Sequence, residues 1–362
     1  MKITYVYADR PYEWNTSEWR CAMPARAINR SGVHTAFLVD LFDFERNSAE
    51  VQGFLDQSDI VLVERNLRTT VLAAIQRLKA KGKPVAANFD DAYHLMTPDN
   101  PSYPYWFEGK TFSVNEKGER IEGRIDPVPL TQFKWGLRMV DAITVPSKVL
   151  MRDWQDYVDA YLVPNYIDLT NYLTAERKPH DGVIIGWGGS LSHLQSFTDS
   201  GVLEALRRVL QARPAVKVMI CGDKRVYDHV DLPEDRKVFQ GFVPFSQWPG
   251  VVVNFDIGLA PLQGAYDERR SWIKPLEYMV LKVPWAASDG PAYEDIRNYG
   301  VLVQNTAEAW EQTLLDMVDR LEAYREMAAG EPYRFGIAQG IDDNVDKIVA
   351  TYQEIIDNVQ GG

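Results

Sequence analysis

The chain has 362 residues, of which 46% are apolar and 25% are charged, and its formal net charge is −12. This length suits two domains, because a single domain usually takes about 100–200 residues. The negative charge argues against tight, non-specific binding to nucleic acid or anionic membranes, which needs clustered lysine and arginine.

The sequence lacks the signals of membrane and secreted proteins. No run approaches the ~20 apolar residues needed to span a bilayer, and the N-terminal apolar run is too short for a signal peptide. We therefore expect a cytoplasmic protein without integral membrane association. Cys21 and Cys221 fit neither a disulfide framework nor a metal cluster, so we expect two buried thiols.

The first half alternates short β-rich runs with helical patterns. One predicted helix, over 69–82, ends at Gly82, a usual C-cap residue. Strands that alternate with helices of this length predict βαβ units and a mostly parallel sheet. We predict a Rossmann-like domain over 1–165, with strands at 3–8, 34–39, 59–64, 84–89 and 142–146.

Residues 97–130 interrupt this alternation with a long, aromatic-rich segment. Such a segment inside a compact domain is usually functional or mobile. One interpretation is a hairpin flap whose aromatic side chains, Trp106 among them, stack on a sugar or base of an acceptor. The other is a surface hairpin packed by its own aromatic side chains.

The second half repeats the pattern and predicts a second Rossmann-like domain over 166–328. The Pro- and Asn-punctuated segment 161–172 suits a hinge. The C-terminal segment, 329–362, contains an amphipathic helical pattern at 342–359. The predicted strands are 182–187, 216–221, 256–262, 283–288 and 301–304, and the predicted helices are 200–212, 273–282 and 306–328.

The stretch DERRSWIKPLEYM, residues 267–279, places Ser271, Lys274 and Glu277 three residues apart. Pro275 is tolerated early in a helix, so we expect the helix to start near 271–274. A helix N-terminus beside a hydroxyl and an ammonium binds phosphate well, and a carboxylate one turn later accepts hydrogen bonds from ribose. The spacing indicates a nucleoside-diphosphate site, with a Ser cap and a surface ion pair as the alternative.

Two other segments of this half follow predicted strands. Gly188, Gly189 and Ser190 form what we call the glycine turn, where a backbone can approach a phosphate closely. Lys224 and Arg225 follow the next strand, and they can reach a phosphate or the base. For these two residues an ordinary exposed turn is the alternative.

Asp90, Asp91 and His94 follow the strand at 84–89. The paired carboxylates can accept a proton from an acceptor hydroxyl, cap a helix or hold Mn²⁺ or Mg²⁺, while His94 can contact a donor sugar. We rank acceptor-side contact first, structural capping next and metal binding last, and we expect no metal. His180 and His193 are expected to face solvent.

The order of these pieces resembles the GT-B glycosyltransferases, most closely family 4, of bacterial or bacteriophage type. The join VPNYID (163–168), the glycine turn and the run from DIGLAPL (256–262) to VPWAAS (283–288) carry the resemblance. It implies an α/β fold with two Rossmann-like domains whose parallel sheets face each other across a cleft. The last helix would return to the first domain.

Carried over residue by residue, the resemblance makes Glu277 the ribose carboxylate. It places Ser271 and Lys274 in the diphosphate loop, with the glycine turn facing the phosphates. On the acceptor side, Arg20 would point from the start of the first helix toward the cleft.

Two departures from the family pattern concern positive charge. The family has a second Glu eight residues before Glu277, where this chain has Arg269, and no Lys or Arg lies between 188 and 206. We infer that Arg269, Lys274 and Lys224 supply the cations for the leaving group. The candidate catalytic residues are Asp91, His94, Arg269 and Lys274.

The resemblance implies a hexosyl- or pentosyltransferase that uses a nucleotide-diphosphate sugar, a UDP-sugar first, with retention and no required cofactor. The acceptor is a surface glycan or a modified base in phage-type DNA. Charge does not decide between them, because 103–138 hold six basic and five acidic side chains. A nucleotide-sugar 2-epimerase-like GT-B enzyme and an inactive nucleotide-sugar binding module are the alternatives, and the oligomeric state is open.

Overall fold

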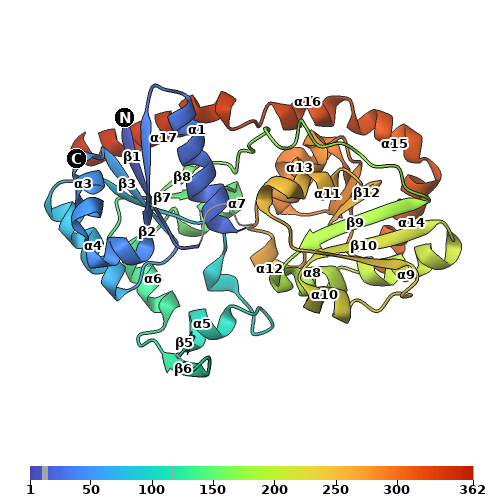
Figure 1. Cartoon of the computed structure of the whole chain (residues 1–362), viewed down its shortest axis with the longest axis horizontal. Helices are drawn as coiled ribbons and strands as arrows, with labels where there is room; N and C mark the ends of the chain where they lie inside the picture. The colour runs from blue at the N-terminus through green and yellow to red at the C-terminus, as the bar shows by residue number, and fades with distance from the viewer. Residues whose placement is uncertain (10–14, 116, 362) are drawn as a thin grey trace. The chain divides into compact units, whose positions relative to one another are not determined.

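The computed structural model describes residues 1–9, 15–115 and 117–361. The chain divides into two compact units, which Figure 1 colours along the sequence. Unit 1 consists of Met1–Tyr166 and Ile341–Gly362, and unit 2 consists of Ile167–Gly340. Each unit is an α/β sandwich around its own sheet.

Unit 1 is built on a six-stranded parallel sheet with the strand order β2-β1-β3-β4-β7-β8. Every residue of β3 and β4 is buried, as expected for parallel strands covered on both faces. Five strands confirm the prediction, whereas β8 was missed because it is a short edge strand without a fully buried side chain. The strands are β1 (Lys2–Tyr7), β2 (Thr35–Asp40), β3 (Ile60–Glu64), β4 (Val85–Asn88), β7 (Ala142–Val145) and β8 (Asp159–Leu162).

The helices of unit 1 include the C-terminal helix α17, which fulfils the amphipathic pattern at 342–359. Its Tyr352 hydroxyl accepts a hydrogen bond from Tyr5 of β1 at 3.0 Å. The helices are the π-helical turn η1 (Glu18–Ala22), α1 (Met23–Arg30), α2 (Leu41–Arg46), α3 (Ala49–Gln57), α4 (Thr69–Ala80), α6 (Pro129–Leu137), α7 (Lys148–Trp154) and α17 (Val345–Gly361).

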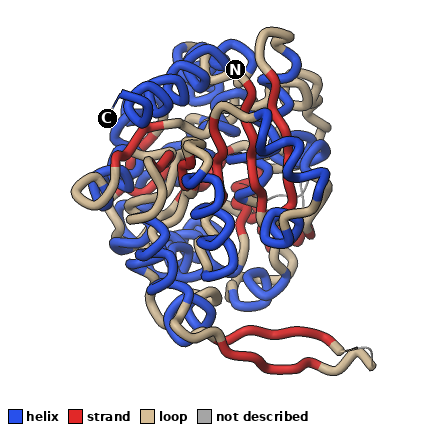
Figure 2. Tube along the Cα trace, turned by 90° about the vertical axis from the view of Figure 1, so that its left-hand side faces the viewer, coloured by secondary structure: helices blue, strands red, loops and turns tan. Residues whose placement is uncertain are grey.

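The aromatic-rich segment 97–130 contains a short helix, α5 (Tyr103–Glu108), and an antiparallel hairpin of β5 (Lys110–Val114) and β6 (Arg120–Arg124). Figure 2 shows the two strands side by side, away from the six-stranded sheet of unit 1. All of β6 is exposed, and the guanidinium of Arg120 lies 3.4 Å from the ring centroid of Phe112. Both interpretations predicted a hairpin, which is confirmed.

Unit 2 repeats the architecture with a parallel sheet of order β11-β10-β9-β12-β13-β14. The five predicted strands are present, and β11 was missed at the sheet edge, where only one of its residues is buried. The strands are β9 (Val183–Gly189), β10 (Val216–Gly222), β11 (Lys237–Gly241), β12 (Ile257–Ala260), β13 (Trp285–Ser288) and β14 (Val301–Val303).

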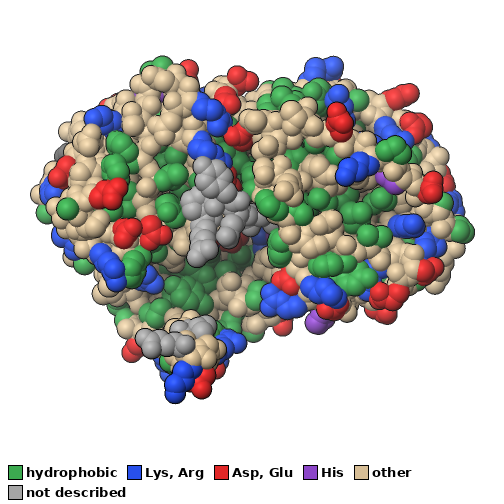
Figure 3. All heavy atoms as spheres, in the orientation of Figure 1, with side chains coloured by type: hydrophobic (Ala, Val, Ile, Leu, Met, Phe, Trp, Pro, Cys, Tyr) green, Lys and Arg blue, Asp and Glu red, His purple; other side chains and the backbone are tan. Residues whose placement is uncertain are grey.

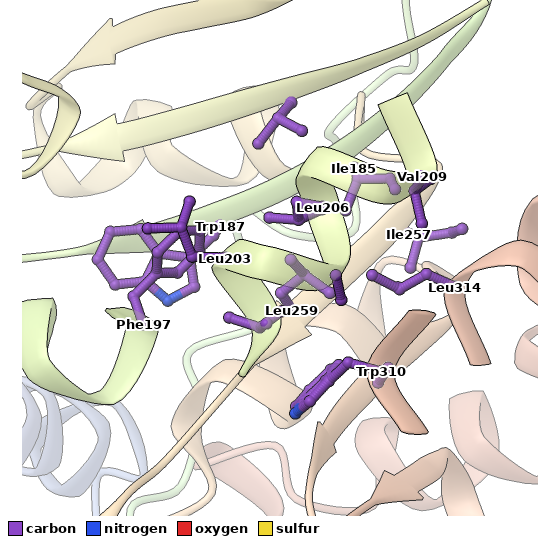
Figure 4. Packing of buried hydrophobic residues seen from close by; sticks show 14 of the residues in the cluster. Ile185, Trp187, Phe197, Leu203, Leu206, Val209, Ile257, Leu259, Trp310 and Leu314 are labelled. Atoms are coloured by element: carbon purple, nitrogen blue, oxygen red, sulfur yellow. The ribbon is translucent and has the colours of Figure 1, made fainter. Parts of the chain in front are cut away.

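The core of unit 2 forms where the sheet meets its covering helices, and Figure 4 shows part of it. Trp187 of β9, Leu206 of α9 and Trp310 of α14 are buried in this cluster. The predicted helix at 306–328 is divided in two at Arg320. The helices are α8 (Leu194–Asp199), α9 (Val202–Ala212), α10 (Lys224–His229), α11 (Trp248–Val252), α12 (Gly264–Asp267), α13 (Ile273–Val280), α14 (Ala307–Asp319), α15 (Leu321–Ala328) and α16 (Glu331–Ile337).

Unit 2 extends beyond the predicted boundary at 328 because α16 packs within it. A Cβ on Gly336 of α16 would lie 3.0 Å from the Cβ of Met279 in α13, so these helices are in close contact. The chain therefore returns to unit 1 at Ile341 rather than at 329.

Candidate functional site

The segments of unit 2 predicted to bind phosphate meet at one edge of its sheet. Because β9, β10 and β12 are parallel neighbours, their carboxyl ends lie at the same edge. The register pairs Gly189 with Gly222, which brings the glycine turn beside the start of α10. Open α/β sheets bind ligands at this edge.

Helix α13 starts where the stretch 267–279 predicts. Ser271 precedes the helix, Lys274 and Pro275 lie in its first turn, and Glu277 is buried one turn later. The hydroxyl and the ammonium therefore lie near the helix N-terminus, where backbone N–H groups and the helix dipole favour an anion.

His193, at the end of the short 3₁₀ helix η3 (Leu191–His193), lies between two cations. Its Nε2 is 3.1 Å from Nη1 of Arg270 and 3.3 Å from Nζ of Lys274. Guanidinium and ammonium groups only donate, so Nε2 accepts and the imidazole is neutral. Burial, followed by the charges of Arg270 and Lys274, lowers the pKa of His193 well below 6.5. His193, expected to face solvent, is half-buried and in contact with both cations.

Asp267 balances one of these cations from inside the unit. This carboxylate is 4% exposed and accepts hydrogen bonds from Nε of Arg270 at 2.7 Å and from the backbone N–H of Gln263 at 3.0 Å. It also accepts from the hydroxyl of Ser196 in α8. Asp267 thus fixes the loop that carries Arg270 against the helix that follows the glycine turn.

Arg269, the predicted leaving-group cation, has different partners. Its guanidinium donates to the carboxylate of Glu268 at 3.0 Å and to the carbonyl of Ala265 at 3.1 Å. The guanidinium that lies beside His193 and Lys274 belongs to the next residue, Arg270. Sequence spacing did not identify Arg270, although Asp267 three residues before it is a usual ion-pair spacing.

Glu277 is 1% exposed and held by two aromatic donors. Its Oε1 accepts from the hydroxyl of Tyr172 at 2.6 Å and from Nε1 of Trp248 at 2.9 Å. Burial raises the pKa of Glu277 to about 7, although both hydrogen bonds and the charge of Lys274 oppose the shift. Sequence reasoning missed Tyr172 and Trp248, which lie in distant segments of the chain.

Both glycines of the turn make room for side chains of unit 2. A Cβ on Gly188 would lie 2.6 Å from Cη2 of Trp248, and one on Gly189 would lie 2.8 Å from Cζ2 of Trp187. In the same turn, the hydroxyl oxygens of Ser190 and Ser192 are 2.9 Å apart. Packing alone therefore requires glycine at 188 and 189, and their approach to a phosphate stays a prediction.

Lys224 and Arg225 lie in the exposed first turn of α10 and have local partners. Lys224 pairs with Asp228 one turn later, and Arg225 donates to Asp223 at 2.6 and 2.9 Å. This is the arrangement of an ordinary exposed turn, the alternative for these two residues. Their contact with a phosphate or a base stays a prediction.

Unit 1 has polar side chains at the corresponding edge of its own sheet. Arg20 of η1 is 3% exposed; its Nε donates to Oδ1 of Asn88 at 2.8 Å, and its Nη1 donates to the carbonyl of Val163 at 2.6 Å and to Asn165 at 3.0 Å. The guanidinium thus joins the first helical turn to the ends of β4 and β8. Because these three hydrogen bonds are internal, Arg20 lies inside unit 1 instead of on an open surface.

Asp90 and Asp91 follow β4 at this edge. Oδ1 of Asp90 is buried and makes no hydrogen bond within the described part of the chain. Burial and the neighbouring charge of Asp91 raise the pKa of Asp90 to about 7, whereas Arg20 and Arg65 oppose the shift. A carboxylate with these properties can accept a proton near neutral pH.

His94 and Trp106 are engaged in the packing of unit 1. Nε2 of His94 lies 3.2 Å from Oδ2 of Asp153. Trp106 is 5% exposed, and its ring stacks on Tyr93 with centroids 4.1 Å apart and meets Phe133 edge-on at 5.7 Å. Trp106 therefore does not present an open aromatic surface to an acceptor, because its neighbours in the core cover it.

Residues 1–9, 15–115 and 117–361 contain no cluster of three or more His, Cys, Asp or Glu side chains arranged to hold a metal ion. Over the same residues, no helix has the length and apolar character required to cross a membrane. Both cysteines are buried free thiols, as predicted.

The two units match solved structures along nearly their whole length. Sucrose-phosphate synthase from Thermosynechococcus elongatus is 10% identical, with 98% of each chain covered and a TM-score of 0.66. HepE from Anabaena, solved in complex with UDP and glucose, is 11% identical, with 98% of this chain and 99% of that chain covered and a TM-score of 0.64. The chain has the GT-B fold. The predicted fold class is thus confirmed.

Proteins whose names indicate a different reaction have the same fold. A putative UDP-N-acetylglucosamine 2-epimerase from Listeria monocytogenes is 14% identical, with 99% of this chain and 97% of that chain covered and a TM-score of 0.57. At these identities the likeness concerns the fold. No protein-family model and no curated protein matches the sequence, so membership of family 4 and a bacteriophage type stay predictions.

Proposed function

We propose that the protein is a glycosyltransferase that moves a sugar from a nucleotide-diphosphate sugar to an acceptor hydroxyl. The observation that carries this proposal is the convergence of Arg270, Lys274 and His193 beside the N-terminus of α13. Positive side chains at a helix N-terminus on the carboxyl edge of a parallel sheet suit a diphosphate. We favour a UDP-sugar because HepE, which has a similar fold, was solved in complex with UDP and glucose.

In this proposal Glu277 holds the ribose of the nucleotide. Its Oε1 already accepts from Tyr172 and Trp248, so Oε2 is the oxygen that would accept the ribose hydroxyls. The two aromatic donors fix the carboxylate before the nucleotide arrives. Such preorganisation reduces the entropy lost on binding.

The proposed chemistry depends on stabilising the departing diphosphate. Breaking the bond between sugar and phosphate leaves positive charge on the sugar and negative charge on the diphosphate. Cations and N–H groups that bind the diphosphate most tightly as it leaves lower the barrier, and removal of one such donor costs about 2.7–4 kcal/mol in other enzymes. Lys274 and Arg270 have this role, so the proposed reaction requires no metal. We also propose that the reaction retains configuration, as the resemblance to family 4 implies.

For the acceptor we propose the polar edge of unit 1, with Asp90 and Asp91 near the hydroxyl that attacks. The buried Oδ1 of Asp90, with a raised pKa of about 7, suits removal of a proton from that hydroxyl. A surface glycan and a modified base in phage-type DNA are the two acceptor classes. Figure 3 shows Lys, Arg, Asp and Glu side chains interspersed on the visible face of unit 1, which favours neither class.

A second candidate function is an epimerase of the same fold. The full-length likeness to a putative UDP-N-acetylglucosamine 2-epimerase favours considering it. Such an enzyme would convert the donor sugar without an acceptor. An inactive nucleotide-sugar binding module would bind the donor and release nothing.

The test is an assay with a panel of nucleotide sugars, each incubated with and without glycan and DNA acceptors. Nucleotide release that increases with an acceptor supports the transferase, and conversion of the sugar without release supports the epimerase. Binding without either product indicates the inactive module. Lys274→Ala should abolish release, whereas Lys217→Ala, an exposed lysine of β10, should retain it.

A further inference from the structure

The imidazole of His193 lies between two cations, Arg270 and Lys274, in a position where a negatively charged group would be more usual. Its Nε2 lone pair accepts from Arg270 at 3.1 Å and from Lys274 at 3.3 Å. These side chains come from the segment before α13 and from its first turn, whereas His193 follows β9. Two segments of unit 2 thus direct one N–H donor each toward a nitrogen atom of a third segment.

The charges around this nitrogen are positive on balance. Arg270 and Lys274 are the charged groups that act on the imidazole. Asp267 of α12 bonds to Arg270, and Asp223 accepts a hydrogen bond from the backbone of Leu191 in η3. From β9, the apolar ring of Trp187 meets the imidazole edge-on, with centroids 6.5 Å apart. The imidazole therefore stays neutral while no anion is bound.

A bound diphosphate would change the net charge around Nε2 of His193 from positive to negative. Its oxygens carry negative charge and accept from guanidinium and ammonium groups more strongly than a neutral nitrogen does. Once Arg270 and Lys274 donate to the diphosphate, the Nε2 lone pair is released and faces the negative charges. Protonation then turns Nε2 into a third donor to the anion.

We propose that His193 is a proton-coupled ligand of the donor diphosphate: it binds as a neutral acceptor of Arg270 and Lys274 in the free protein and as an imidazolium donor in the complex. One proton passes from solution to Nε2, and no covalent bond to the diphosphate forms. This inference rests on the proposed function, because it assumes that a nucleoside diphosphate occupies this site.

The pH dependence follows from the linkage between proton and nucleotide binding. Between the low pKa of His193 in the free protein and its raised pKa in the complex, each nucleotide bound brings one proton with it. The association constant for the nucleotide therefore increases as pH falls through this window, by up to about tenfold per pH unit for one proton.

The experiment is titration calorimetry of the full chain with UDP between pH 6 and 8, in pairs of buffers with different heats of ionisation. The dependence of the measured heat on the buffer gives the number of protons taken up. UDP has a phosphate ionisation near pH 6 of its own (about 6 for a phosphate monoester). Comparison with His193→Gln gives the share of the proton uptake that is due to the imidazole, because the amide oxygen still accepts from Arg270 and Lys274 but does not titrate.

The expected result is that wild type takes up close to one proton more per UDP than His193→Gln near pH 7. His229→Gln, which removes an exposed imidazole on α10, should behave as wild type. UDP binding with equal proton uptake in wild type and His193→Gln would overturn this inference and leave the proposed function standing. Absence of binding of UDP, GDP, ADP and dTDP to wild type would overturn both. If His193→Gln does not fold, a wild-type affinity for UDP that does not increase as pH falls from 8 to 6 overturns the inference.

Discussion

The indole Nε1 of Trp248 donates a hydrogen bond to Oε1 of Glu277 at 2.9 Å, and the far edge of the same indole lies 2.6 Å from where a Cβ on Gly188 would be. One side chain thus connects the glycine turn after β9 with the carboxylate in α13. The two segments that the sequence assigned to a nucleotide are parts of one packed arrangement.

Substitution Gly188→Ala should displace the Trp248 indole, which is 8% exposed and has little room to move. Overpacking of this kind costs about 1–3 kcal/mol of stability, and UDP affinity should fall because Glu277 loses a donor. Denaturant unfolding and UDP titration measure the two effects. Gly250→Ala in α11 is the matched control, because a Cβ there meets nothing within 4 Å. Equal stability of both variants would show that the indole is not confined.

Glu277→Gln should change how stability depends on pH. The pKa of Glu277 is about 7 in the folded protein and 4.5 ordinarily, so between these values the folded state holds a proton that the unfolded state has released. Stability therefore falls as pH rises from about 4.5 to about 7, by about 3 kcal/mol from this group. The glutamine keeps an oxygen for Tyr172 and Trp248 and should not show this loss.

Denaturant unfolding at pH 5 and pH 8 measures this difference. The variant should gain stability relative to wild type at pH 8 but not at pH 5. A difference between wild type and variant that is the same at both pH values would contradict the raised pKa of Glu277.

Much of the fold could be predicted because the signals were local. Buried β-branched runs identified the central strands, and Pro275 identified the start of α13. The partners of the site residues could not be predicted in this way. Tyr172 is 105 residues from Glu277, and His193 is 81 residues from Lys274, so only the topology brings them together. Edge strands such as β8 were missed because their side chains are only partly buried, which removes the apolar pattern.

Asp256→Asn should destabilise unit 2 at the edge opposite the candidate site. This carboxylate is fully buried, pairs with Arg177 and Arg325, and accepts from the backbone N–H of Ile184 at 2.7 Å. Both guanidinium groups are about one-third exposed, and Arg325 keeps its pair with Glu322. The substitution weakens hydrogen bonds between charged groups, and such a bond contributes about 1.5–3 kcal/mol. Thermal unfolding measures the loss, with the exposed Asp181→Asn as control. A loss no larger than that of the control would contradict this role of Asp256.

Asp90→Asn should slow the proposed reaction without weakening UDP binding. Donor hydrolysis is a suitable assay, because water replaces the acceptor hydroxyl. Loss of a proton acceptor lowers the rate by about 10²–10⁴-fold, and the wild-type rate should rise with pH through about 7 as Asp90 ionises. The exposed Asp99→Asn should retain both the rate and its pH profile. Unchanged hydrolysis by Asp90→Asn would exclude Asp90 as the proton acceptor.

The central claim is that the N-terminus of α13 binds a nucleoside diphosphate, and thermal unfolding with UDP, GDP, ADP and dTDP tests it most directly. A nucleotide at about 100 times its dissociation constant should stabilise wild type by about 2.7 kcal/mol. Lys274→Ala should lose this stabilisation, and Lys217→Ala should keep it. If no diphosphate stabilises wild type, or if Lys274→Ala is stabilised as much as wild type, the claim is contradicted.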